Sequence, residues 1–594
     1  MSVMAYSASG TPASSAIWGV AGHRWTAVAH RQLLLWGPAL LAGALAVVVN
    51  ALGWQGTDHA AQAYRVEEVR QHGLVLWDSG WYGGNYPLSY SVVFPLLGAL
   101  LSLPVVAVLS AAAATGAFDR LVTSAFGSRP LGSWYFAVST VLPVAIGQLP
   151  FLCGEAAGLA AVLVLAGRRR SRPARRLAAV ALGVFAALCS PLAAAFLILA
   201  CLVWAGVSYA SGKRASGDHA SGDHASGDPA SGDHGGWHPL ASHSRPAVIA
   251  LAVAAAAVVG VLAVVFPGTG SFPFPWSGLP GPLLLCAVLA LPLLGAAPVI
   301  RWAALVYALA CLASFLIPNP LGGNAPRLGA AVGVPLLACI LTRRGAAVSW
   351  ATWTNKSPKI VVASVLVPFV IWQWAPGMQV DTSGASTQAA LQRLYQPLIA
   401  QLARREAGPM RVEVVPTKDH WEAASLAPQI SLARGWERQL DIADDPLFYG
   451  PGGLTPASYR QWLVDNGIQW VALPSVALDY AGEAEATLLR QGGVGDLRLA
   501  WASPDWRLWR MTDSPGLVSG PGRLSILGPD HLVLQAGRPG TLLVRVRYTG
   551  YWQVSSGQAC VTASPDGWTT VEAHKAGMVS LTISLLPHSS SACP

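Results

Sequence analysis

Apolar runs separated by short polar turns recur between residues 33 and 376 and constrain the fold more than any other feature of this chain. Hydrophobic residues make up 53% of the 594 residues and charged residues only 11%, whereas soluble proteins carry about 25% charged residues. A helix needs about 20 apolar residues to cross the hydrocarbon core of a bilayer. The sequence therefore predicts a polytopic α-helical membrane protein.

Eleven runs are candidate transmembrane helices: 33–53, 89–113, 133–150, 151–168, 177–190, 192–208, 247–266, 281–297, 302–317, 328–342 and 359–376. The strongest basic runs all fall on the cytoplasmic side when the N-terminus lies inside the cell. This orientation predicts a cell-membrane protein with a cytoplasmic tail at 1–32 and a transmembrane domain at 33–376. The outward segments are then 54–88, 267–280, 318–327 and everything after residue 376.

The net charge of +9 does not indicate a nucleic-acid partner, because the basic residues cluster at the ends of apolar runs. Residues 209–245 contain Ala-Ser-Gly-Asp-His repeats and predict a disordered cytoplasmic linker. Metal binding by its His219, His224 and His234 is the less favoured interpretation, since the intervening Gly and Ser residues provide no fixed scaffold.

The region after the last apolar run has two parts of ordinary composition. Helical and strand patterns alternate in residues 377–515, which predicts an extracytoplasmic α/β domain. Residues 516–594 are rich in β-forming segments between Gly, Pro and Asp turns and predict a β-sandwich. Cys560 and Cys593 either form a disulfide in this outward domain or remain two free thiols.

The first outward loop, residues 54–88, is the main candidate for chemistry. A helix from Asp58 to His72 would place Asp58, Gln62 and Arg65 on one stripe. A carboxylate there can act as a base or hold a divalent ion, Mg²⁺ or Mn²⁺, and an arginine suits a phosphate. The spacing alone favours a simpler role, in which Asp58 only caps the helix.

Further polar and aromatic residues in the outward loops extend this candidate site. Aromatic rings in the glycine-rich segment 77–87 can stack on a sugar or anchor at the membrane interface. Glu155 belongs either to the site or to a hairpin turn after Pro150. Arg327 is a second candidate phosphate ligand, or a residue at a helix end that reaches the interface. The candidate substrate-binding residues are His59, Trp77, Asp78, Trp81, Tyr82, Asn85 and Asn324.

Two charged and aromatic motifs in the α/β region, 418–422 and 434–438, have two interpretations. They either bind a saccharide or form a salt-bridged surface packed on the membrane domain. We favour the packed surface, because polar clusters are common in extracytoplasmic domains.

The loop layout resembles the GT-C superfamily, membrane glycosyltransferases that use polyprenyl-phosphate sugars and carry an acidic residue in the first outward loop. More closely, the chain resembles an actinobacterial membrane-protein family described as related to 6-pyruvoyl-tetrahydropterin synthase and often labelled transporter. The resemblance implies a catalytic or metal-linked role for Asp58, although His59 stands where many GT-C enzymes have a second acidic residue. The residues that carry it are Asp58, Tyr64-Arg65, Gly73, Trp77, Trp81 to Gly84, Tyr86-Pro87, Gly147 to Phe151, Ser190-Pro191, Asn319 to Asn324 and Tyr548 to Trp552.

Three functions fit these features. The favoured one is a glycosyltransferase in the lipid bilayer that moves a sugar from a polyprenyl-phosphate donor to an envelope glycan, lipid or protein. A non-catalytic envelope assembly or glycan-binding protein is the first alternative. A transporter or lipid flippase is the second, and it is disfavoured because the expected spans carry almost no charge at their centres and show no internal repeat.

Overall fold

The computed structural model describes residues 36–127, 131–167, 172–218, 245–268, 270–342, 357–450, 452–585 and 593. The predicted N-terminal tail and most of the predicted linker, with its three histidines, lie outside the described residues. Helix α9 continues to Asp218, so the first part of the range predicted as a disordered linker is helical.

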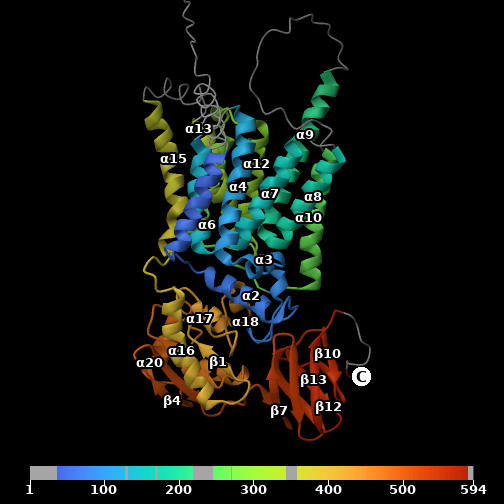
Figure 1. The fold of residues 1–594 in the computed structure, drawn as a ribbon, viewed down its shortest axis with the longest axis vertical. Helices are drawn as coiled ribbons and strands as arrows, with labels where there is room; N and C mark the ends of the chain where they lie inside the picture. Colours follow the sequence, from blue (N-terminus) through green and yellow to red (C-terminus); the bar gives the residue numbers. More distant parts are fainter. Residues whose placement is uncertain are drawn as a thin grey trace, which may run out of the picture.

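The membrane domain is a bundle in which each of the eleven predicted ranges contains helix (Figure 1). Among the described residues, seven helices are long and apolar enough to cross a membrane. These are α4 (Leu103–Phe126), α7 (Leu149–Ala166), the 191–210 part of α9 (Pro191–Asp218), α10 (Arg245–Val265), α12 (Pro298–Leu316), the segment Gly322–Thr342 and Lys359–Gln379.

The remaining helices of the bundle are shorter or more charged. Shorter apolar helices span Trp36–Ala51, Leu131–Ile146 and Trp276–Ala290. Within these segments and the long spans lie α5 (Leu131–Ser139), α6 (Val141–Ile146), η3 (Trp276–Gly278), α11 (Pro280–Ala290), η5 (Gly322–Asn324), η6 (Gly329–Gly333), α13 (Val334–Thr342), α15 (Pro358–Trp374) and η7 (Ala375–Gln379). Helix α8 (Arg172–Cys189) and the single turn η4 (Pro292–Leu294) complete the set.

The span predicted at 89–113 is wrong in its bounds. The chain breaks at Ser102, where φ is +77°, and Pro104 follows in the first turn of α4. The preceding α3 (Val93–Leu101) is a separate short helix, and the long span is α4. Asp119 and Arg120, expected between spans, therefore lie within a helix, and Asp119 is buried.

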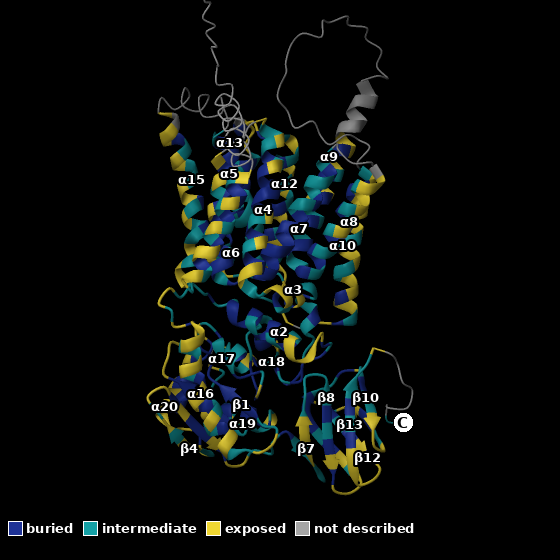
Figure 2. Ribbon diagram, in the orientation of Figure 1, coloured by how far each residue is buried: buried dark blue, intermediate teal, exposed yellow. Residues whose placement is uncertain are grey.

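Burial separates the centre of the bundle from its lipid-facing side (Figure 2). Helices α4 and α7 are the most buried of the long spans, whereas only 22% of the α10 span and 17% of the span Lys359–Gln379 are buried. Exposed side chains on these outer helices, such as Val264 and Ile371, are large and apolar. Such a surface is stable against lipid and costly in water, so the protein is a multi-pass membrane protein.

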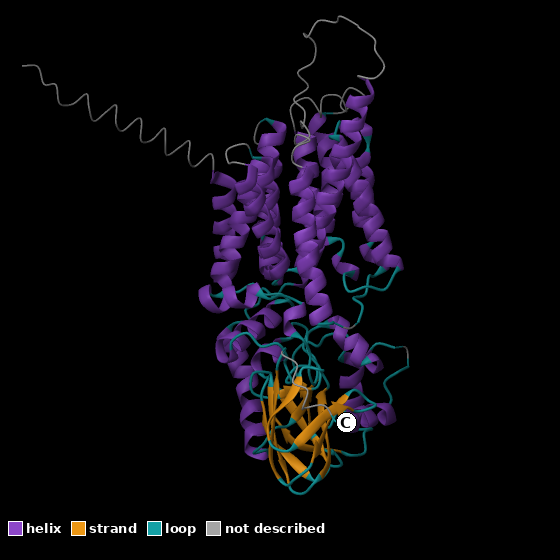
Figure 3. Cartoon of the chain, turned by 90° about the vertical axis from the view of Figure 1, so that its right-hand side faces the viewer, coloured by secondary structure: helices purple, strands orange, loops and turns teal. Residues whose placement is uncertain are grey.

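The C-terminal domains and the loops predicted to face outward gather at one end of the bundle, called here the outer end (Figure 3). Helix α2 (His59–His72) and η1 (Pro87–Ser89) lie between the bundle and these domains. The loops at 267–279 and 318–327 pair there, since the Phe272 N–H donates to the Asn319 carbonyl at 3.0 Å.

The α/β domain contains a five-stranded sheet in the order β2-β1-β3-β5-β4. Strands β2 and β3 run parallel to β1, and β5 runs antiparallel to β3 and β4. The strands are β1 (Arg411–Val414), β2 (Ser431–Leu432), β3 (Trp470–Pro474), β4 (Leu497–Ala502) and β5 (Trp506–Met511). The helices are α16 (Gln388–Arg405), α17 (Trp421–Ser425), α18 (Arg438–Asp444), η8 (Pro446–Phe448), α19 (Pro456–Asp465) and α20 (Glu483–Gln491).

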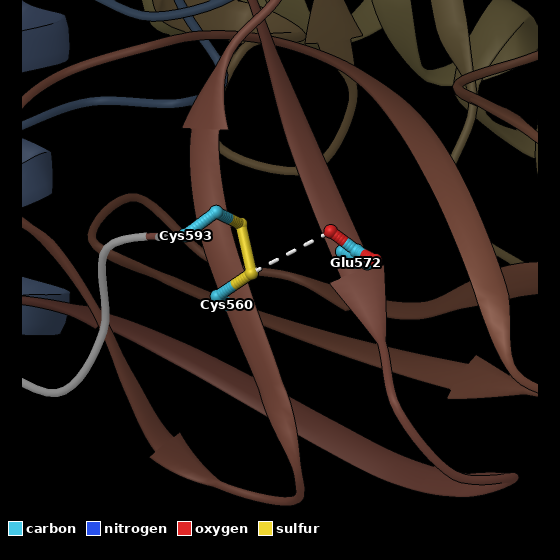
Figure 4. The surroundings of a disulfide bond; sticks show 3 residues. All are labelled: Cys560, Glu572 and Cys593. Atoms are coloured by element: carbon cyan, nitrogen blue, oxygen red, sulfur yellow. Dashed lines mark hydrogen bonds between the residues drawn. A yellow bond between two sulfur atoms is a disulfide. The ribbon is translucent and has the colours of Figure 1, made fainter.

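The last domain consists of two four-stranded antiparallel sheets, β10-β13-β8-β7 and β11-β12-β9-β6. Cys560 and Cys593 form a disulfide with 4.9 Å between the two Cα atoms, and the Glu572 carboxylate lies beside it (Figure 4). The strands are β6 (Val518–Ser519), β7 (Gly522–Leu527), β8 (His531–Ala536), β9 (Gly540–Arg547), β10 (Trp552–Ser556), β11 (Ala559–Ala563), β12 (Trp568–Ala573) and β13 (Gly577–Ile583).

Candidate functional site

The start of α2 is fixed against the end of α6. The Asp58 N–H donates to the Ile146 carbonyl at 3.1 Å. Gly147, with φ +94°, permits this approach, because a Cβ atom there would lie 2.4 Å from the His59 nitrogen. His59 is buried with Nε2 at 2.9 Å from the Val144 carbonyl, and burial lowers its pKa to about 4. The neutral imidazole therefore anchors the helix, and His59 does not line the cavity described below.

Asp58 and Arg327 meet at this point, although 269 positions separate them in the sequence. An Nη atom of Arg327 lies 3.7 Å from Oδ2 of Asp58, and both side chains are mostly buried. Burial raises the pKa of Asp58, while Arg327, Thr57 and His420 oppose the rise. A carboxylate in this state binds a proton more readily than an exposed aspartate, which suits a proton acceptor near neutral pH.

The capping role that the spacing favoured for Asp58 is wrong. Asp58 occupies the N-cap position, but its backbone is helical and its side chain makes no capping hydrogen bond. The carboxylate instead faces Arg327 and the Thr57 hydroxyl, which lies 3.5 Å from Oδ1. The ion pair across the bundle thus takes the place of the local contact.

The two terminal nitrogens of the Arg65 guanidinium, two turns along α2, have different surroundings. One nitrogen, Nη2, donates to the carbonyls of Pro87 and Ser91. The other, Nη1, is buried and has no hydrogen-bond partner among the described residues. The guanidinium carbon lies 5.1 Å from the centre of the Tyr90 ring. A buried donor without a partner is costly, so it marks a place where a ligand or water acceptor is expected.

Tyr90 connects Arg65 with the Asp58–Arg327 pair. Burial raises the pKa of its hydroxyl to about 12, and charges on Asp58, Arg327, Arg65 and Glu437 also act on it. Asp58 and Arg65, two of the three residues that the sequence placed on one stripe, therefore both lie near one aromatic ring. Nothing places Gln62, the third, at this ring: it is fully buried, and its side-chain atoms have no hydrogen-bond partner among the described residues.

A cavity of about 20 Å³ lies on the Arg65 side of Tyr90. It has room for a single water molecule, so a sugar can enter only if its walls separate. Its lining combines one guanidinium, two carboxyl groups and several aromatic rings, from Ala61, Tyr64, Arg65, Asp78, Trp81, Asn85, Pro87, Tyr90, Trp436 and Glu437.

The aromatic segment 77–87 connects the bundle to both C-terminal domains. Trp77 packs into the core of the β-sandwich, and Tyr82 packs into the core of the α/β domain. Both are almost fully buried, and neither is among the residues that line the cavity. Trp81 also packs in the α/β core but lines the cavity, where it stacks on Tyr64 at 4.5 Å.

The remaining predicted polar residues occupy different places. Asp78 and Asn85 pair through their backbones, close the 78–85 loop and line the cavity. Asn324 lies half-buried in the Arg327 loop. Glu155 is buried inside α7 rather than in the hairpin turn, and its Oε1 has no hydrogen-bond partner among the described residues.

The C-terminal α/β domain supplies two cavity residues from the 434–438 motif. Trp436 and Glu437 form one wall, and the Trp436 ring meets Tyr90 edge-on at 5.6 Å. The favoured interpretation of their motif was a salt-bridged packed surface, and Arg434 and Arg438 in it do form ion pairs, with Asp441 and Asp479. In the 418–422 motif, His420 is buried between Glu422 and Asp479.

The surroundings of Asp58 do not fit a divalent metal ion. A hard cation needs several oxygen ligands, whereas the ion-pair neighbour of Asp58 is a guanidinium. The described residues contain one cluster of three potential ligands, Cys560, Glu572 and His574, in the β-sandwich. The Cys560 sulfur there belongs to the disulfide. We therefore derive no step through a metal.

Buried carboxyl groups around the cavity predict how stability depends on pH. Burial raises the pKa of Asp78 to about 6, of Glu437 to about 7 and of Glu68 to about 8. The folded protein therefore holds more protons than the unfolded chain in this range, and its stability falls as pH rises from about 4 to 8. His420, with its pKa raised to about 9, acts in the same direction.

We expect the melting temperature of the protein in lipid to be higher near pH 5 than near pH 8. Thermal unfolding at a series of pH values, at constant ionic strength, measures this. The Glu68→Gln variant should show a weaker dependence, because it lacks one of the shifted groups. A melting temperature that rises between these pH values would contradict the assignment.

Comparisons with known proteins include a distant structural likeness. No family model matches the chain, and no curated protein matches it. A cryo-electron microscopy structure of the arabinofuranosyltransferase AftD from Mycobacteria aligns with a TM-score of 0.44 and 14% sequence identity. The match covers 89% of this chain and 43% of the AftD chain, so this chain spans less than half of that length. A likeness at this level leaves the function to be judged from the chain's own residues.

Proposed function

We propose that this protein is a GT-C-type membrane glycosyltransferase that moves a sugar from a polyprenyl-phosphate donor to a cell-envelope acceptor at the outer face. The observation that supports the proposal is the pairing of Asp58 with Arg327 near Tyr90, a ring that lines a cavity together with Arg65. The Nη1 atom of this Arg65 is buried without a hydrogen-bond partner among the described residues. A proton acceptor and two guanidinium groups thus lie together at the end of a membrane bundle. Transfer from a lipid phosphate to a hydroxyl needs this combination of groups.

In the proposed reaction, Asp58 takes the proton of the acceptor hydroxyl as its oxygen attacks the anomeric carbon. The bond from that carbon to the phosphate oxygen breaks, and the phosphate leaves with the electron pair. Arg327 and Arg65 would stabilise the growing charge on the phosphate, since guanidinium forks match phosphate oxygens. The Trp81 ring and the Trp436 ring on the opposite domain offer apolar faces to the sugar once the cavity widens.

The C-terminal α/β domain would hold the acceptor side of this site. Glu437 and Trp436 come from the α/β domain, whereas Arg65 and Tyr90 come from the membrane domain. The one-water cavity then corresponds to a closed state, and substrate entry requires the α/β domain to move relative to α2.

Sugar transfer by the purified protein in lipid tests the proposal. The donors would be a panel of polyprenyl-phosphate sugars, and the acceptor an envelope extract. We expect the sugar to be transferred from at least one donor. The transferred sugar should remain attached to the acceptor after the donor lipid has been removed. Failure with every donor, alongside specific retention of an envelope glycan by the same protein, would instead favour the assembly or glycan-binding function. Movement of a lipid donor across the bilayer without transfer would favour a flippase.

A further inference from the structure

Two cysteine side chains meet where α7 and α8 come together at the outer end of the bundle. Sγ of Cys153 lies 3.6 Å from Sγ of Cys189, although 36 positions separate the two residues. Cys153 is 7% exposed and Cys189 0%, and both are free thiols in this structure. Cys153 lies one turn after the start of α7, and Cys189 is the last residue of α8. The pair therefore lies about one helical turn below the outer end of the bundle.

The backbones of the two helices almost touch beside this pair. A Cβ atom on Gly154, the residue after Cys153, would lie only 3.2 Å from the carbonyl oxygen of Ala186 in the last turn of α8. A disulfide needs two Cα atoms within about 7 Å and two sulfur atoms about 2 Å apart. The close backbone approach favours the first condition. The second needs the sulfur atoms to move about 1.5 Å closer, which rotation of the side chains can provide.

The outer end of the bundle faces the compartment in which a disulfide of this chain is formed. The Cys560–Cys593 disulfide belongs to the β-sandwich, which lies beyond the same end (Figure 1). Disulfides form and persist in oxidising compartments, so a thiol pair near this end meets the same oxidants while the protein folds. Cys201, by contrast, lies ten residues along α9 from Pro191, about 15 Å deeper in the bundle.

We propose that Cys153 and Cys189 form a second disulfide, which fastens α7 to the end of α8. The oxidant would be the disulfide of an extracytoplasmic thiol oxidoreductase, which reaches the thiols before the helices have packed. One cysteine thiolate attacks this disulfide and forms a mixed disulfide, and the second thiolate then displaces the oxidoreductase. Two protons and two electrons pass from the cysteine thiols to the oxidant, which leaves as a dithiol. The proposed disulfide does not depend on the proposed function.

The end of α8 also supports the backbone segment that holds Arg65. The Val92 N–H donates to the carbonyl of Leu188, the residue before Cys189, at 2.9 Å. The neighbouring Ser91 carbonyl accepts a hydrogen bond from Nη2 of Arg65 at 2.8 Å. A covalent bond at Cys189 would therefore restrain the segment against which the guanidinium is placed.

Counting the free thiols of the full chain tests the disulfide without any substrate. Membranes from cells that export the protein are denatured in excess N-ethylmaleimide, so that every free thiol is labelled before it can oxidise in vitro. The mass of the intact, unreduced protein then gives the number of labels. Of the six cysteines outside the Cys560–Cys593 disulfide, we expect only four to be labelled. The Cys560–Cys593 disulfide, retained in the same sample, shows that existing disulfides survive the procedure.

Single substitutions make the count decisive. Cys153→Ala and Cys189→Ala each release the partner thiol, so each should raise the number of labels from four to five. The matched control Cys201→Ala removes a buried cysteine from another helix and should lower the number from four to three. Six labels on the wild type, with five on every variant, would show that both thiols stay reduced and would overturn the proposal.

Hydrogen exchange of the 88–92 segment tests what the disulfide does. We expect this segment to exchange at least about fivefold faster in Cys153→Ala than in Cys201→Ala, because the end of α8 is no longer fixed to α7. Cys153→Ala leaves the sequence of α8 unchanged, so the hydrogen bond to Val92 can still form. Equal exchange in the two variants would refute a restraining role for the disulfide. Absence of sugar transfer would count against the proposed function alone, since neither measurement involves a sugar.

Discussion

Replacing Asp58 with asparagine should lower the rate of sugar transfer by about 10²- to 10⁴-fold, the range that general-base catalysis contributes. Asparagine has nearly the same shape but cannot take the proton of the acceptor hydroxyl. The side chain makes no capping hydrogen bond, and the backbone contact to Ile146 does not involve the carboxylate. The variant also loses the charge that faces Arg327, so its melting temperature is measured beside the transfer rate to separate the chemical step from folding.

Single-turnover transfer by wild type and Asp58→Asn, both in lipid, measures this effect. The matched control is Glu67→Gln, which removes a carboxylate from the exposed face of the same helix and should transfer at the wild-type rate. Equal melting temperatures would show that the variant is folded. Transfer by folded Asp58→Asn at the wild-type rate would reject Asp58 as the base and leave the enzyme class intact.

Replacing Arg434 with methionine should destabilise the α/β domain by about 3–5 kcal/mol, the usual cost of breaking a buried ion pair. Arg434 is 5% exposed and donates to both oxygens of Asp441, at 3.1 and 2.8 Å. It also lies 3.3 Å from Glu485 and 3.6 Å from Glu413, two fully buried carboxyl groups. Methionine would fill much of the space but leave these carboxyl groups without a cation.

Unfolding of the full chain in lipid, followed by protease sensitivity of the C-terminal region, measures this loss. Arg460→Met is the matched control, because its ion pairs with Asp496 and Asp513 are partly exposed. Exposed pairs contribute about 0–1 kcal/mol. Lower pH should partly rescue Arg434→Met, since protonation removes the uncompensated charges. A loss no larger than that of Arg460→Met would show that the domain does not depend on this network.

Local patterns in the sequence predicted which segments are helical better than they predicted where each helix begins and ends. The helix expected at 58–72 is α2, because its residues are good helix formers and Gly73 provides the positive φ that ends it. The membrane helices follow from apolar composition in the same way. The break at Ser102 was missed although Pro104, within the expected span, is typical of a helix start.

The site depends on contacts between distant segments, which limited its prediction. Asp58, Arg65 and Arg327 were selected from their residue types and their outward position, but their proximity required the fold. Aromatic residues were the least predictable. Trp77 and Tyr82 are of residue types typical of a sugar pocket, yet they pack into the cores of two different domains. Glu437 was overlooked as a cavity residue because nothing in its local sequence indicates that it approaches Arg65.

A double-mutant cycle on sugar transfer tests most directly whether Asp58 and Arg327 act together in one catalytic centre. The rates of wild type, Asp58→Asn, Arg327→Gln and the double variant would be measured with the same donor and acceptor. If the two residues serve one transition state, the double variant should lose little more activity than the worse single variant. Losses that multiply, or wild-type transfer by both single variants, would contradict a shared centre.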